Sequence, residues 1–376
     1  MASSSETREF GLHRETIYRI WQNLEMDFRR LFISTTMALF LLCGTLLFSV
    51  RSQTPPVQDD DVVRTETDLT NLLFTATDKQ RRFITTLREE DIRLFEDGTR
   101  QQLFTFQRQT ERPLSIALLI DVSASEERTL PEEKAAARAF VETIVRSSRD
   151  EAAVIPFEDN AYLEQPLTTN VISIYQALQR VEVALPSYLG TGRPIGGLPS
   201  GPGIRAQREG STAIWDAVAV TAGEVLERSR GQRRRAIILM TDGFDTSSRL
   251  NRSAAIEEAI KSETVIYAIG IGDSRYDGVD KKAVTDIAER TGGRAFFTKK
   301  NTDLTSAFQQ IEEELRSQYL IAYSSTNKNR DGAYRQMRIE ITNPDLRRDQ
   351  LKLRYRPGYF AKPLEKVRTA SDRVTP

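Results

Sequence analysis

The sequence predicts an α/β fold with a doubly wound, mainly parallel sheet, and two observations lead to this prediction. The first is an apolar stretch of strand length, Leu114–Ile120, which is interrupted only by Ser115. A near-continuous apolar strand suits burial on both faces, as in a parallel sheet that is covered by helices. The second is the alternation of strand-like and helix-like segments from Pro113 onwards, which is typical of parallel sheets.

The elements of this α/β region, residues 113–316, follow from apolar periodicity and from stop signals. Pro131 and the alanines at 135–137 favour a helix after the first strand, and Thr291-Gly292-Gly293 ends a later one. We expect strands at 114–120, 152–157, 161–165, 236–240, 264–269 and 294–297, and helices at 132–146, 171–183, 212–228, 253–261, 280–290 and 304–317. Residues 186–210 hold seven glycines and four prolines, so regular structure is not expected there.

Two segments with β character flank this region, at residues 62–112 and 317–360. Their alternating patterns predict strands at 69–77, 83–87, 92–96, 102–107, 318–324, 335–342 and 350–355. Neither segment has enough strands to bury a core of its own. We therefore expect them to pair into one discontinuous β-sandwich.

The N-terminal part predicts export from the cytoplasm. Residues 31–50 form a run of 20 residues without a charged side chain, which is long enough to span a bilayer. Arg29-Arg30 favour a cytoplasmic location for residues 1–30. A cleaved signal peptide starting at Met26 is the alternative. Residues 51–61 read as a linker and 361–376 as a disordered tail. The protein is then either anchored in the inner membrane and facing the periplasm, or secreted; both place it in the cell envelope or beyond.

Composition excludes several classes of function. The chain has 53 basic and 53 acidic residues, so bulk charge does not favour nucleic acid as a partner. Its one cysteine, Cys43, and its one histidine, His13, both precede the predicted folded region. An intramolecular disulfide, a cysteine-based zinc site and a catalytic set that needs histidine are therefore not expected.

Oxygen-bearing side chains follow two of the predicted strands. Asp121, Ser123 and Ser125 come after the strand at 114–120, and Asp242 comes after the strand at 236–240. Thr212 adds a hydroxyl at the start of a predicted helix. Ligands of open α/β sheets bind beyond the carboxyl ends of the strands, and carboxylates with hydroxyls suit a hard cation such as Mg²⁺. The alternative is that these side chains only cap helices.

These three segments, D-x-S-x-S at 121–125, G-S-T-A-x-x-D-A at 210–217 and T-D-G at 241–243, resemble the von Willebrand factor type A (VWA) domain. That domain has a Rossmann-like fold and a metal-ion-dependent adhesion site (MIDAS). The resemblance implies a cation, Mg²⁺ or else Mn²⁺ or Ca²⁺, held by Asp121, Ser123, Ser125, Thr212 and Asp242. It also implies a protein partner that supplies a carboxylate to the cation.

A wider resemblance covers residues 62–360. Thr77-Asp78-Lys79, Phe95-Glu96-Asp97-Gly98 and Gln318-Tyr319 resemble the motifs that surround the VWA domain in the VWFA-related family of exported proteins common in acidobacteria. The N-terminal 50 residues are not explained by this similarity.

A binding module for adhesion or assembly, without catalytic residues, is the function that these observations favour. One alternative is a metal-dependent hydrolase, in which Asp245 or Asp273 would assist a metal-activated water. Another is a scaffold with an unused metal site. The basic run at 228–235 precedes the strand at 236–240, so we expect it at the opposite end of the sheet, as a solvated connecting loop.

Overall fold

A computed structural model describes most of the chain after residue 68. The described residues are 69–108, 112–146, 148–183, 193–195, 211–229, 233–272, 278–298 and 301–363, with the backbone alone at 193, 194, 301 and 302. They belong to a compact unit that runs from Thr67 to Pro376. The predicted leader, membrane or signal segment and linker (1–61) lie outside these residues, as do 364–376 of the predicted tail. No described helix is both long enough and apolar enough to cross a bilayer.

The central sheet has six strands in the order β12-β11-β10-β5-β6-β8. These strands are β5 (Leu114–Asp121), β6 (Glu151–Phe157), β8 (Gln165–Thr168), β10 (Arg234–Thr241), β11 (Thr264–Ile271) and β12 (Ala295–Thr298). All neighbours are parallel except β8, which pairs antiparallel with β6 at one edge. All residues of β5 are buried, which explains why its sequence is apolar apart from Ser115 and the terminal Asp121.

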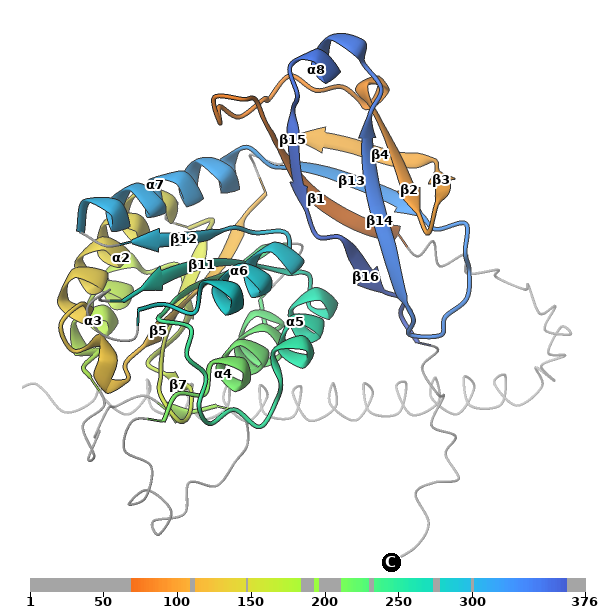
Figure 1. Cartoon of the computed structure of the whole chain (residues 1–376). Helices are drawn as coiled ribbons and strands as arrows, with labels where there is room; N and C mark the ends of the chain where they lie inside the picture. The colour runs from red at the N-terminus through yellow and green to blue at the C-terminus, as the bar shows by residue number, and fades with distance from the viewer. Residues whose placement is uncertain are drawn as a thin grey trace, which may run out of the picture. The chain divides into compact units, whose positions relative to one another are not determined.

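Helices cover both faces of this sheet, as Figure 1 shows. One layer consists of α2 (Leu130–Ile144), α3 (Val171–Arg180) and α7 (Asn301–Arg316). It packs on the strand side chains that include Ile116, Leu118 and Ile120. The other layer consists of α4 (Ile214–Val220), its π-helical continuation η4 (Thr221–Leu226), α5 (Arg252–Lys261) and α6 (Lys281–Arg290). Alternate strand residues, such as Ala117 and Leu119, face this second layer, as the period of a strand requires.

The flanking segments form two four-stranded sheets, β15-β1-β13-β4 and β16-β14-β2-β3. Their strands are β1 (Leu69–Thr77), β2 (Ile92–Glu96), β3 (Thr99–Gln101), β4 (Leu103–Arg108), β13 (Tyr319–Ser324), β14 (Tyr334–Ile341), β15 (Lys352–Tyr355) and β16 (Gly358–Phe360). Each sheet contains strands from both sides of the α/β region, and one shared apolar core includes Leu72, Leu94 and Ile321. The predicted fold class, an α/β sheet flanked by a discontinuous β-sandwich, is therefore confirmed.

A buried polar network ties the two halves of the sandwich together. The Glu96 carboxylate has 2% exposure. It accepts hydrogen bonds from the hydroxyls of Tyr323 at 2.7 Å, Tyr359 at 3.0 Å and Ser325. Arg335, which is also 2% exposed, lies 3.4 Å from it. Four donors from the C-terminal segment thus satisfy one carboxylate from the N-terminal segment, as a buried charge requires.

Several predicted elements differ from the structure. Phe83 forms only an isolated bridge to Thr77 instead of a strand over 83–87. The helix expected at 212–228 begins at Ile214 and changes to π geometry at Thr221. A two-residue strand, β9 (Arg193–Pro194), occurs where no regular structure was expected, and it pairs with β7 (Tyr162–Leu163). The short helix α8 (Pro344–Arg348) was not predicted. The domain boundaries themselves stay predictions.

The prediction of a solvated basic loop is wrong for residues 233–235. Arg234 begins β10 and is only 4% exposed. Its guanidinium donates to the carbonyl of Leu315 and, at 3.2 Å, to that of Arg112. Backbone carbonyls at the ends of other elements attract these side chains inward, which a sequence pattern does not reveal.

We expect Glu96→Gln to destabilise the protein by about 3 kcal/mol, because the amide NH₂ would face donors in a buried site. Urea unfolding measures this change. Glu90→Gln is the matched control, because Glu90 lies in the same segment with its side chain 74% exposed. A loss equal to that of the control would mean that the network does not hold the sandwich together.

Candidate metal centre

Asp121 lies at the carboxyl end of β5 with no exposed surface. Its Oδ1 accepts from the backbone N–H of Ser123 at 3.0 Å, and its Oδ2 accepts from the hydroxyl of Thr241 at 2.7 Å. Burial raises the pKa of Asp121 to about 6; the hydrogen bonds from Ser123 and Thr241 oppose this shift, and the charge of Asp242 adds to it. A carboxylate in this position would be stabilised by a nearby cation.

The chain turns sharply after Asp121. Ser123 precedes a short 3₁₀ turn, η2 (Ala124–Glu126), and its hydroxyl lies 3.0 Å from that of Ser125. The D-x-S-x-S spacing therefore places both hydroxyls next to each other. Ser123 is buried and Ser125 is exposed.

Asp242 follows the neighbouring strand β10 and lies next to Asp121. The pairing of Met240 with Ile120 sets β10 in register with β5, so both strands end at the same edge of the sheet. Gly243 has φ +86°, and a Cβ there would lie 2.8 Å from a methyl of Val284. Only glycine fits this turn, which explains the third letter of T-D-G.

Thr212 is 5% exposed and is held against the loop that follows Asp242. Its backbone N–H donates to the Thr246 hydroxyl at 2.7 Å, and its carbonyl accepts from the N–H of Thr246 at 2.9 Å and of Ser247 at 3.1 Å. Asp245, from the same loop, accepts from the N–H of Ile214 at 2.8 Å at the start of α4. The three motif segments therefore converge through backbone contacts as well as through strand register.

Two buried glutamates outside the predicted ligand set lie near the two aspartates of that set: Glu126 joins them in an acidic cluster, and the charge of Asp121 acts on Glu133. Carboxylate oxygens of Asp121, Glu126 and Asp242 all lie within 4.8 Å of one another. Glu126 and Glu133 are buried. Among the described residues, one oxygen of Glu126 and both oxygens of Glu133 have no hydrogen-bond partner. Burial raises the pKa of both glutamates. At Glu126 the charges of Glu133 and Asp121 add to this shift, whereas at Glu133 interactions with Thr129 and Glu126 oppose it.

This donor set fits a divalent cation. Unsatisfied carboxylate oxygens in a buried cluster are unfavourable unless a positive charge or protons compensate them. Oxygen-only donors suit Mg²⁺, Mn²⁺ or Ca²⁺. Glu126 and Glu133 were missed because a pair of glutamates at 126–127 and another at 132–133 resemble the usual acidic first turn of a helix.

Comparison with known proteins agrees with this geometry. Two models of the von Willebrand factor type A domain match the chain, over residues 116–244 and 203–313. Residues 116–313 therefore form a von Willebrand factor type A domain, and the class of protein predicted from the motifs is confirmed.

The individual proteins that the chain resembles have low sequence identity to it. The chain is 26% identical to integrin alpha-X of Mus musculus over 157 residues, which are 41% of this chain and 13% of the integrin. Among solved structures, proximal thread matrix protein 1 from the mussel byssus, with a zinc-occupied MIDAS motif, is 19% identical, with a TM-score of 0.43 over 58% of this chain and 49% of that one. A von Willebrand factor type A protein from Catenulispora acidiphila is 12% identical, with a TM-score of 0.43 over 79% of this chain and 74% of that one.

We expect Glu126→Gln to raise the melting temperature without metal by about 1–3 °C, because it removes one carboxylate from a crowded buried cluster. The same change should reduce the stabilisation by Mn²⁺, which binds the native state preferentially. Thermal melts of the full chain in EDTA and in Mn²⁺ measure both effects.

Two further variants serve as controls for this measurement. Asp121→Asn should abolish the Mn²⁺ response, and Glu127→Gln should leave it intact because Glu127 is exposed. A full Mn²⁺ response in Glu126→Gln would show that Glu126 does not contribute to the cation site.

Proposed function

We propose that this chain is a metal-dependent binding module for adhesion or assembly. Its cation, Mg²⁺ or else Mn²⁺ or Ca²⁺, is held by Asp121, Ser123, Ser125, Thr212 and Asp242. The observation that carries this proposal is the acidic cluster at the carboxyl edge of the sheet, where three carboxylates approach within 4.8 Å. The match to the von Willebrand factor type A domain supports the same use of this edge.

A protein partner that supplies a carboxylate would complete the coordination of the cation. Three of the five ligands are neutral hydroxyls, so the two aspartates only balance the charge of a divalent cation, and the ion can still accept one more carboxylate oxygen. Two apolar side chains follow Asp242 at the surface: Phe244 is 38% exposed and Leu250 is 42% exposed. An acidic residue with an apolar neighbour on the partner matches this combination, since interfaces favour aromatic contacts near their centre.

The carboxylate of Glu126 could compete with the partner carboxylate for binding to the cation. This carboxylate lies within the cluster and belongs to the same chain as the five ligands. If it bound the cation, a partner carboxylate would have to displace it. The module would then bind only partners whose contacts outside the metal favour that exchange.

The location proposed for this module is the cell envelope or the exterior. The uncharged run at 31–50 supports export, either as a membrane anchor or as a cleaved signal. A binding module outside the cytoplasm has access to divalent cations and to surface partners.

Hydrolase chemistry is less well supported. Asp245 accepts hydrogen bonds from the N–H of Ile214 and from the hydroxyl of Ser248, so it acts as a helix cap and not as a base. Asp273 lies outside the described residues. We therefore infer that Asp245 does not serve as a general base, and we favour binding over hydrolysis as the function.

The test is recovery of partners by the full chain from envelope extracts in Mg²⁺ and in EDTA. We expect partners to be released by EDTA and to bind at least about tenfold more weakly to Thr212→Ala, which removes one neutral ligand. Thr212→Ala should still show a thermal response to Mn²⁺, which separates loss of the partner from loss of the metal. Thr246→Ser, which keeps the hydroxyl that holds Thr212, is the control. Partners that remain bound in EDTA with unchanged affinity would contradict the mechanism.

A further inference from the structure

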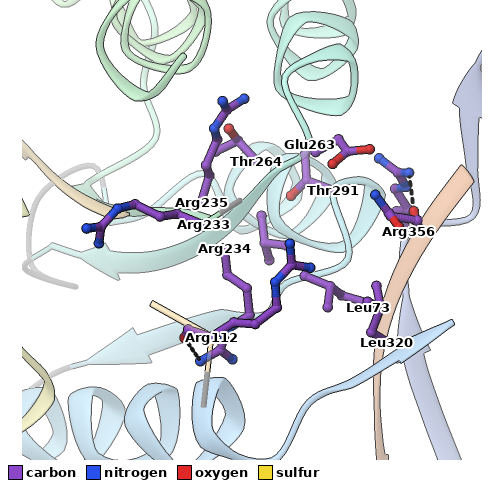
Figure 2. Close-up of a pocket in the computed structure, with 12 residues that line it drawn as sticks. Leu73, Arg112, Arg233, Arg234, Arg235, Glu263, Thr264, Thr291, Leu320 and Arg356 are labelled. Atoms are coloured by element: carbon purple, nitrogen blue, oxygen red, sulfur yellow. Dashed lines mark hydrogen bonds between the residues drawn. The ribbon is translucent and has the colours of Figure 1, made fainter. Parts of the chain in front are cut away.

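A second polar cavity lies at the opposite end of the central sheet, where β10 and β11 begin. Its volume is about 240 Å³, and residues of β1 and β13 from the sandwich complete its wall. Figure 2 shows the side chains that surround it. Its lining consists of Asn71, Leu73, Arg112, Arg233, Arg234, Arg235, Glu263, Thr264, Val265, Thr291, Leu320 and Arg356.

The lining carries a large excess of positive charge. Five of its residues are arginines, and Glu263 is the one carboxylate among them. Arg233 has an acidic neighbour outside the lining, Glu151, at 3.7 Å. No described carboxylate forms an ion pair with Arg234 or Arg356. Glu263 acts on Arg356, and Asp150 on Arg234, only as a favourable charge without an ion pair.

Backbone contacts hold both guanidinium groups in place. Arg234 donates to the carbonyls of Leu315 and Arg112, and Arg356 donates to those of Asn71 at 2.6 Å and Ile260 at 3.3 Å. Dashed lines in Figure 2 mark the contacts of Arg234 and Arg356 within the cavity wall. The Nε–H of each has no acceptor among the described residues. Fixed, desolvated donors of this kind bind an anion strongly, because little ordering remains to be done.

We propose that this cavity binds a small phosphate-bearing ligand. A phosphate group accepts several N–H donors at once and supplies negative charge to Arg234 and Arg356, which form no ion pair with a described carboxylate. The cavity has room for several water molecules, hence for a phosphate with a short substituent. Leu73, Val265 and Leu320 form an apolar part of the wall, which suits a ligand with an apolar portion next to the phosphate. A soluble phosphate ester and a phospholipid headgroup share this chemistry.

This site is independent of the cation site. The eight residues of β5 from Leu114 to Asp121 separate the two ends of the sheet, about 25 Å at the rise of a strand. Removal of divalent cations should therefore leave phosphate binding unchanged. Binding measured in EDTA therefore tests the phosphate site alone, and its failure can be distinguished from failure of the adhesion proposal.

Calorimetric titration of the full chain with pyrophosphate, in EDTA and at constant ionic strength, tests the proposal. We expect saturable binding, and a loss of at least about tenfold in affinity in Arg356→Gln. Arg348→Gln is the matched control: it removes the same charge from a side chain that is 82% exposed and outside the cavity. We expect its affinity to equal that of the wild type.

A second variant covers the case in which Arg356→Gln does not fold. Asn71→Asp is nearly isosteric and adds a carboxylate to the wall beside Arg356. We expect it to raise the melting temperature and to abolish pyrophosphate binding, because it supplies the counter-ion itself. A vesicle flotation assay identifies the source of the phosphate. If the wild type floats with phosphatidylglycerol vesicles more than with phosphatidylcholine vesicles, and Asn71→Asp abolishes this binding, the ligand is a lipid headgroup. Absence of saturable binding, or an equal loss in Arg348→Gln, would overturn the proposal.

Discussion

Asp121 is a carboxylate with no exposed surface at the end of the central strand of a parallel sheet. Its two oxygens are held by Ser123 and Thr241, so the side chain cannot turn away from the neighbouring acids. Asp242 and Glu126 approach within 4.8 Å, and such crowding is unfavourable without a positive charge. The loops around the site, including the glycine turn at 243 and the contacts of Thr212, all keep these groups together.

The two ends of the central sheet carry charged groups of opposite sign. The carboxyl edge gathers three carboxylates, and the amino edge gathers five arginines around one carboxylate, Glu263. The discontinuous sandwich matters for the second of these, because its strands β1 and β13 supply part of the cavity wall. The sandwich thus does more than flank the sheet: it encloses a second polar site.

Much of the fold could be predicted because its signals are local. The apolar strand at 114–120 and the D-x-S-x-S and T-D-G turns depend on residues that are close in sequence. Glu126 and Glu133 could not be recognised, because their proximity to Asp121 depends on how η2 and α2 fold back over the site. The inward course of Arg234 likewise depends on the carbonyl of Leu315, 81 residues away. The positions of these side chains depend on contacts with residues that are distant in sequence, and local sequence patterns do not reveal such contacts.

The acidic cluster beside Asp121 is expected to hold a divalent cation. Anomalous diffraction from crystals of the protein grown with Mn²⁺ would locate that ion. We expect one strong anomalous peak at this edge of the sheet, about 2.0–2.6 Å from each oxygen that binds the ion directly. These oxygens belong to Asp121, Ser123, Ser125, Thr212 or Asp242, and the remaining members of this set would bind through water. A peak only elsewhere on the molecule, or none at this edge of the sheet at saturating Mn²⁺, would contradict this expectation.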